Sequence, residues 1–111
     1  MSYPALFTTP GMRDFAEAVD AERQRQLEQF GDQHHPILRG LHSAVLFEDM
    51  AQALRKANED PDERCWMTIL LEEAYEAGAE RDLVKFRAEV VQIAAVCQAI
   101  ITDLDRQGAR R

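Results

Sequence analysis

The sequence predicts an all-α fold, an antiparallel bundle of about four helices. Its long stretches repeat apolar residues at helical spacing, and none alternates with the period of two that a strand would show. The four prolines and five glycines fall near the ends of these stretches. With 111 residues, the chain is long enough for one core and too short for two. We therefore expect one domain over residues 1–111, with flexible tails at residues 1–9 and 107–111.

The first expected helix begins at Thr9-Pro10 and ends before Gly31. The Thr9 hydroxyl is a suitable N-cap, proline is favoured in a first turn, and glycine commonly follows a last turn. The apolar stripe of this helix comprises Met12, Phe15, Val19, Leu27 and Phe30. Three polar residues interrupt that stripe, namely Glu22, Arg23 and Gln26.

A second helix is expected from Ser43 to about Asn58, after a loop over residues 32–42. Its side chains that should face inward are Leu46, Phe47, Met50, Leu54 and Ala57. The loop contains the pair His34-His35, but adjacent side chains seldom bind one metal together, so we expect no metal site there.

A third helix is expected from about Pro61 to Ala79. The segment Asp60-Pro61-Asp62-Glu63 combines a capping acid, a proline at the first helical position and an acid where a capping box needs one. The chain is then expected to turn between Gly78 and Asp82.

The fourth helix is expected to be capped by Asp82 and to reach about Arg106. Its apolar seam alternates spacings of three and four residues, which is typical of a left-handed bundle. The seam consists of Leu83, Phe86, Val90, Ile93, Cys97, Ile100 and Leu104. Ten of the twelve residues from Val90 to Ile101 are apolar, so this helix must be covered on more than one side. We therefore expect homo-oligomers that form through the third and fourth helices.

Composition limits the classes of function. Thirteen basic and 20 acidic residues give a net charge of −7, which argues against binding to a nucleic-acid polymer. Cys65 and Cys97 follow neither a metal-site nor a disulfide spacing. There is no secretory signal pattern, and no apolar run approaches the ~20 residues of a membrane span. We expect a cytoplasmic protein with no membrane partner.

Carboxylates lie where the third helix should be apolar. Glu73 falls at the centre of the helix's apolar stripe, Glu76 at its edge and Glu72 next to it. If the third and fourth helices pack antiparallel, Glu89 faces these acids, with Gln92 one turn further on. Carboxylate and amide oxygens without histidine or thiolate suit Mg²⁺ or Mn²⁺. Acids three residues apart on a helix are also common on solvated faces, and that interpretation stays open.

Two segments resemble the MazG-like, all-α nucleoside triphosphate pyrophosphohydrolases: Leu71-Glu-Glu-Ala-Tyr-Glu76 and Arg87-Ala-Glu-Val-Val-Gln-Ile-Ala-Ala-Val96. That family carries Glu-x-x-Glu on one helix and Glu-x-x-Asp on the next. Glu73, Glu76 and Glu89 match the first three acids, whereas Gln92 stands at the position of the aspartate.

The resemblance implies a dimer or dimer of dimers that hydrolyses nucleoside triphosphates to monophosphate and pyrophosphate. It assigns Mg²⁺ to Glu73, Glu76 and Glu89, with the uncharged Gln92 as a weaker fourth ligand. Glu72 would then be a general base or an outer ligand. The candidate substrate contacts are Arg23, Gln26, Trp66 and Lys85.

Purely structural interpretations of these residues also stay open. Trp66 can be a core anchor, Lys85 a solvated residue, and Arg23 a surface partner of Glu22 or Glu89. The whole chain can also be a non-catalytic helical oligomerisation module, a degenerate relative in which Gln92 has replaced the metal-binding aspartate. A di-iron bundle is excluded, because the third and fourth helices contain no histidine.

Overall fold

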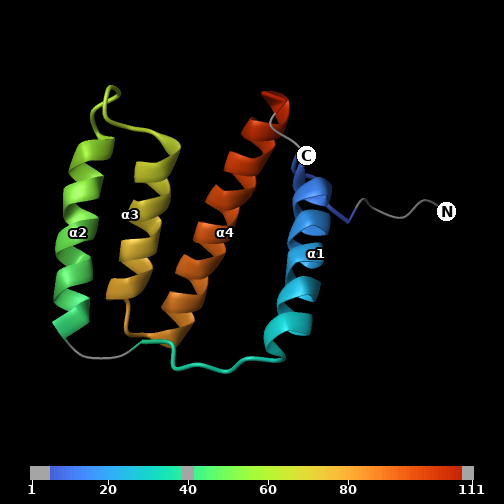
Figure 1. Ribbon diagram of the computed structural model, residues 1–111. Coiled ribbons are helices and arrows are strands. Elements are labelled where there is room, and N and C mark those ends of the chain that lie inside the picture. The colour runs from blue at the N-terminus through green and yellow to red at the C-terminus, as the bar shows by residue number, and fades with distance from the viewer. Residues whose placement is uncertain (1–5, 39–41, 109–111) are drawn as a thin grey trace. The chain divides into compact units, whose positions relative to one another are not determined.

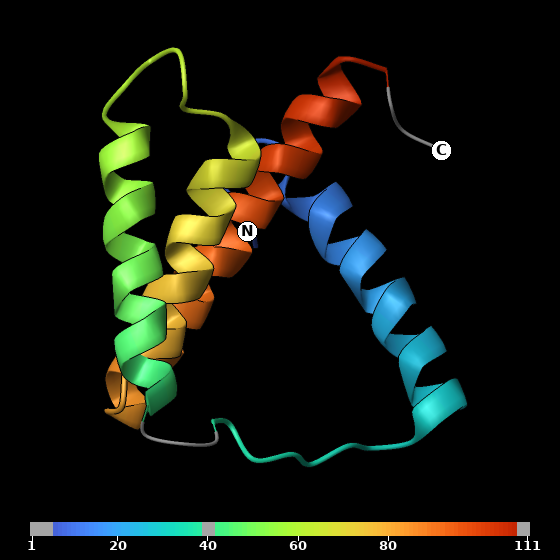
Figure 2. The same cartoon turned by 60° about the vertical axis from the view of Figure 1, so that its left-hand side comes forward.

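The computed structural model describes residues 6–38 and 42–108, and the regular structure in these residues is entirely helical (Figures 1 and 2). The helices are α1 (Met12–Phe30), α2 (His42–Asn58), α3 (Trp66–Ala79) and α4 (Leu83–Arg106). The predicted all-α class and the number of helices are confirmed. None of the four helices has an apolar stretch long enough to cross a membrane. Of the predicted tails at residues 1–9 and 107–111, residues 1–5 and 109–111 lie outside the described residues.

The chain divides into two compact units. Residues 36–97 contain α2, α3 and the first part of α4. Residues 1–35 and 98–111 contain α1 and the last turns of α4.

In the unit of residues 36–97, α2 and α3 pack as an antiparallel pair (Figure 1). Phe47 lies near the start of α2, and the centroid of its ring is 5.9 Å from that of Tyr75 on α3. The same ring packs against Gly78, close to the end of α3. At the opposite end, Asn58 Nδ2 donates a hydrogen bond to the Thr68 carbonyl, 3.1 Å away. Both views place the first part of α4 beside α3 (Figures 1 and 2). The turn between these two helices is short, so they run antiparallel, as expected.

In the other unit, Gln98 of α4 holds the start of α1. Gln98 is buried, and its amide nitrogen, Nε2, donates to the Pro10 carbonyl at 3.1 Å and to Thr102 Oγ1 at 2.7 Å. Gly11 lies so close to Thr102 that a Cβ at that position would collide with the threonine side chain. The start of α1 therefore packs closely against α4 because Gly11 has no side chain, and the amide of Gln98 holds it there by a hydrogen bond.

The start of α1 differs from the prediction. Gly11, with φ +80°, is the N-cap, and the Thr9 side chain does not cap the helix. The Thr9 carbonyl instead accepts the Met12 N–H at 3.2 Å, which closes a turn before the helix. The predicted end is confirmed, because Gly31 has φ +71° and its N–H donates to the Leu27 carbonyl at 2.9 Å.

The prediction is also wrong at the start of α3. Asp60 closes a separate turn: its Oδ1 accepts the Asp62 N–H at 2.9 Å, and its carbonyl accepts the Glu63 N–H at 3.0 Å. A short acidic side chain can bond to nearby backbone in a turn as readily as at a helix start. The helix begins later, at Trp66, where the Cys65 N–H donates to Thr68 Oγ1 at 3.0 Å.

The turn between α3 and α4 is shorter than predicted. Gly78 lies inside α3 rather than in the turn, and the helix continues to Ala79. The predicted cap of α4 is confirmed, since Asp82 Oδ1 accepts the N–H groups of Val84 and Lys85 at 2.9 and 3.0 Å. The start of α2 at His42 lies one residue before the expected Ser43.

The described residues bury little apolar side-chain volume. Ala51 and Ala77 are their buried apolar residues, and none of their large side chains is fully buried. Several side chains predicted to face inward are exposed, among them Leu46 at 57% and Leu83 at 67%. The others of this kind are Val19, Leu27, Phe30, Met50, Val90 and Leu104. Helical periodicity identifies an apolar face on these helices, but it does not establish that another element covers that face.

Candidate metal site in a carboxylate cluster

Three glutamates on two successive turns of α3 form the centre of the candidate site. One carboxylate oxygen each from Glu72, Glu73 and Glu76 lies within 4.8 Å of the others. All three side chains are partly buried. Glu76 follows Glu73 by three residues and Glu72 by four, so its side chain neighbours both of them on the helix surface.

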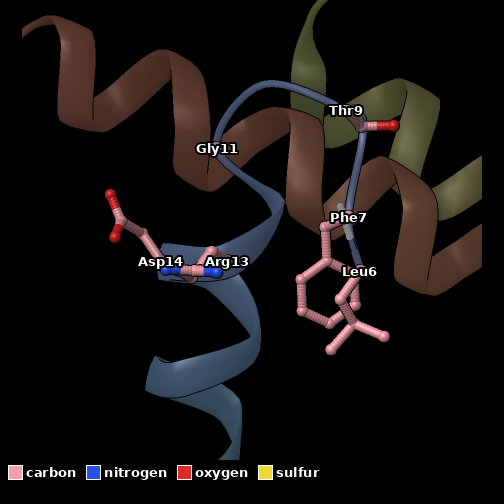
Figure 3. A pocket seen from close by; sticks show the side chains of 6 residues that line it. All are labelled: Leu6, Phe7, Thr9, Gly11, Arg13 and Asp14. Atoms are coloured by element: carbon pink, nitrogen blue, oxygen red, sulfur yellow. The ribbon is translucent and has the colours of Figure 1, made fainter. Parts of the chain in front are cut away.

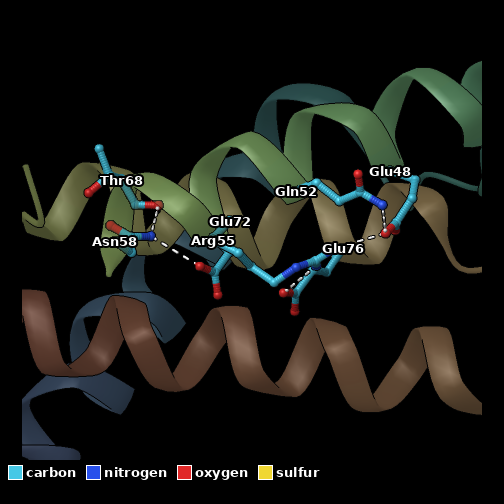
Figure 4. Close-up of polar contacts among 7 residues, drawn as sticks. All are labelled: Glu48, Gln52, Arg55, Asn58, Thr68, Glu72 and Glu76. Atoms are coloured by element: carbon cyan, nitrogen blue, oxygen red, sulfur yellow. Dashed lines mark hydrogen bonds and ion pairs between the residues drawn. The ribbon is translucent and has the colours of Figure 1, made fainter. Parts of the chain in front are cut away.

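Two residues of α2 hold the outer acids of this cluster (Figure 4). Asn58 Nδ2 donates to Glu72 Oε1 at 3.1 Å. Arg55 donates through one guanidinium nitrogen to Glu76 Oε1 at 3.0 Å and through another to Glu48 Oε1 at 2.8 Å. Glu72 and Glu76 therefore each have one oxygen engaged by α2.

Glu73 and Glu89 lack such partners. Oε2 of each side chain is buried and makes no hydrogen bond. Burial raises the pKa of Glu73, and the negative charges of Glu76, Glu89 and Glu72 raise it further. Burial also raises the pKa of Glu89, with the charges of Glu76 and Glu80 adding to the effect. Acids from α3 and α4 thus lie close enough to repel one another.

The donor set fits a divalent cation. A buried carboxylate oxygen without a hydrogen bond is costly, and a cation bound among Glu72, Glu73 and Glu76 would satisfy Glu73. Glu89 is not in this group of close oxygens, so its side chain would have to turn toward the ion to become a ligand. Hard oxygen ligands of this kind are those that Mg²⁺ and Mn²⁺ prefer. Glu72 and Glu76 each retain a second oxygen that could complete the site.

Gln92 is more exposed to solvent than the acids of the candidate site. Gln92 lies one turn after Glu89 on α4, but its side chain is exposed whereas Glu89 is partly buried. A fourth ligand from Gln92 would therefore need its side chain to turn toward the cluster.

The expected substrate-binding residues belong to both compact units. Arg23 and Gln26 lie on α1, outside the unit that carries the acids, and Arg23 donates to Gln26 Oε1 at 2.7 Å. Glu22 pairs with Arg25 rather than with Arg23, and this pairing lowers the pKa of Glu22 to about 2. Trp66 and Lys85 lie in the same unit as the acids, and both are exposed. Trp66 is thus not a buried core anchor.

Arg55 and Asn58 are not among the residues that the sequence predicted. They lie one turn apart on α2, and Arg55 follows the buried Ala51 by four residues. That spacing puts Arg55 on the packed face of the helix, where a cation needs a partner. A charged residue in line with an apolar stripe is the signal that could have identified it.

Two cavities in the described part of the chain are lined by residues other than these acids. One of about 230 Å³ adjoins the start of α1, where the side chains of Leu6 and Phe7 lie together and Asp14 points away from them (Figure 3). A second, of about 340 Å³, is an apolar groove beside α4. The residues lining this groove are Ile37, Leu83, Phe86, Arg87 and Val90.

Comparison with protein-family models, with curated proteins and with solved structures gave no match. The resemblance to MazG-like enzymes therefore stays a prediction, which depends on the motif residues of α3 and α4.

Proposed function

We propose that this chain is a Mg²⁺-dependent nucleoside triphosphate pyrophosphohydrolase of the MazG-like kind. The observation that carries the proposal is the pair of buried, unbonded carboxylate oxygens of Glu73 and Glu89 beside the acids of α3. A purely structural helix pair has no need for acids in this position, because each one loses hydration and repels its neighbours.

In this proposal Glu73, Glu76 and Glu89 hold the cation, and Gln92 can turn in as an additional ligand. The bound Mg²⁺ would neutralise phosphate charge and polarise the attacking water. Glu72 accepts the proton of that water through its second oxygen, while Asn58 keeps the first oxygen in place. The water oxygen bonds to the α-phosphorus, the bond from that phosphorus to the bridging oxygen breaks, and pyrophosphate leaves with the electron pair.

The net charge of −7 supports a substrate that arrives with its cation. A free triphosphate would be repelled by the four glutamates, whereas a magnesium complex brings the missing positive charge. Trp66 and Lys85 are the proposed contacts for base and phosphate in this unit, with Arg23 and Gln26 as candidates on α1. An enzyme that acts on cellular nucleotides would work in the cytoplasm.

We further propose that the chain self-associates through α4, as a dimer or a dimer of dimers. The exposed apolar residues of this helix include Val84 and Val91, and the apolar groove lined by Phe86 and Val90 lies on it. A second copy would cover side chains that the described part of one chain leaves exposed.

The second candidate function is a non-catalytic helical oligomerisation module. The exposed Gln92 favours it, because an uncharged residue at the fourth position weakens any cation site. This candidate predicts self-association without cation-dependent chemistry.

Release of pyrophosphate distinguishes the two functions. The purified chain is incubated with a panel of canonical and modified nucleoside triphosphates and millimolar Mg²⁺. We expect pyrophosphate and monophosphate from at least one substrate, and loss of both with EDTA or in Glu73→Gln. No release from any substrate would support the non-catalytic module, and equal release by Glu73→Gln would contradict the role assigned to Glu73.

A further inference from the structure

Arg55 is a positively charged side chain at the edge of the carboxylate cluster. Its guanidinium bridges Glu76 of α3 and Glu48 of α2, at 3.0 and 2.8 Å. The side chain is 39% exposed, so Arg55 is accessible from solvent. The two hydrogen bonds raise the pKa of Arg55 further, which keeps the group charged.

Arg55 pairs with only one acid of the cluster. Arg55 neutralises Glu76, whereas the buried oxygens of Glu73 and Glu89 have no hydrogen-bond partner. A cation that enters the cluster to satisfy Glu73 comes close to Glu76, which belongs to the same group of oxygens. Arg55 and the cation then compete for Glu76, because two positive groups near one carboxylate repel each other.

We propose that Arg55 is a phosphate-binding residue that Glu76 holds in place until a cation and a polyphosphate bind. This inference rests on the proposed function, since it assigns the residue that receives the phosphate chain. The cation takes over Glu76, and the released guanidinium turns to a phosphate oxygen while Glu48 keeps it at the site. A planar guanidinium is well suited to phosphate, because it can donate two parallel hydrogen bonds.

The proposal predicts opposite changes in two affinities. Without Arg55, a cation alone meets no competitor at Glu76, so Arg55→Gln should bind Mn²⁺ about fivefold more tightly than the wild type. The same variant lacks a phosphate ligand and should bind magnesium tripolyphosphate about tenfold more weakly. Tripolyphosphate is the probe because it carries the phosphate chain without a base. A merely structural role for Arg55 would weaken both affinities together.

Calorimetric titration of the full chain measures both affinities. Arg25→Gln is the matched control, because Arg25 also pairs with a glutamate but lies on α1, and it should change neither value. If Arg55→Gln fails to fold by circular dichroism, Arg55→Lys is used. It keeps the charge but loses the fork, so Mn²⁺ affinity should stay near the wild-type value while tripolyphosphate affinity falls.

Unchanged affinities in the folded variant, or two affinities that fall together, would overturn the phosphate-binding role of Arg55 but leave the proposed function standing. A wild-type chain that binds no Mn²⁺ would instead overturn the proposed function, and with it this inference.

Discussion

Among single residues, Glu73 shows most directly how burial and neighbouring charges act on the carboxylates of the candidate site. Its carboxylate is partly buried, has one oxygen without a hydrogen bond and is surrounded by three other acids. The pKa of Glu73 therefore lies above its ordinary value of 4.5, because burial and the neighbouring charges disfavour the ionised form. The folded state then binds more protons than the unfolded state, so this group lowers the free energy of unfolding as pH rises.

Glu73→Gln should consequently stabilise the metal-free chain at neutral pH, by about 1 kcal/mol, through relief of repulsion among the acids. The gain should vanish as pH falls below the ordinary range of glutamate, because Glu73 is then protonated in both states. Urea denaturation between pH 3.5 and 7.5 measures the difference, with the exposed Glu17→Gln as control. Severe destabilisation by Glu73→Gln would mean that Glu73 is a structural partner rather than a ligand.

Residue patterns predict the acids of the site but not their partners. Glu73 can be identified because a carboxylate at the centre of an apolar stripe conflicts with helical patterning. Arg55 and Asn58 belong to α2, and their pairing with Glu76 and Glu72 depends on the register between α2 and α3. That register is set by tertiary contacts, which the local sequence does not specify.

Among the elements, the contact between α2 and α3 depends on small residues. Ala51 and Ala77 are buried, and the Phe47 ring lies against Gly78. The sequence predicts the existence and type of all the helices, since each has a long periodic stretch. The prediction fails at two helix starts, because Thr9 and Asp60 have capping chemistry that also suits a turn. In both cases a turn forms and the helix begins later.

Gly78→Ala tests the close approach of α2 and α3. Alanine is the better helix former by about 1 kcal/mol, but its Cβ would lie 2.5 Å from Phe47 Cδ2, so the ring must move. We expect a net loss of about 1–3 kcal/mol in the free energy of unfolding, measured by urea denaturation. In a Phe47→Leu background the same change should be less harmful. Equal losses in both backgrounds would show that the Phe47 ring does not restrict position 78.

At the scale of the whole molecule, the chain combines a net charge of −7 with a small buried apolar core in its described residues. A second copy at α4 would bury the apolar side chains of that helix. The composition of this segment alone predicts that it needs further cover, because ten of twelve consecutive residues are apolar. It does not identify the partner, since hydrophobic burial is not directional.

Val91→Glu tests self-association. Val91 is 54% exposed on α4, and a charge there should dissociate the oligomer into monomers. Multi-angle light scattering after size exclusion should give a dimer or tetramer for the wild type. Ala53→Glu, at an exposed position on α2, is the matched control and should keep the wild-type mass. A monomeric wild type at micromolar concentration would refute self-association.

The central claim, that Glu73 and its neighbours bind a divalent cation, is tested most directly by thermal denaturation with and without 5 mM MgCl₂ at matched ionic strength. Binding to the folded state alone should add about 1–3 kcal/mol and raise the wild-type midpoint by roughly 5 °C or more. Glu73→Gln and Glu89→Gln should show no such rise. An identical midpoint for the wild type in both buffers would contradict the claim.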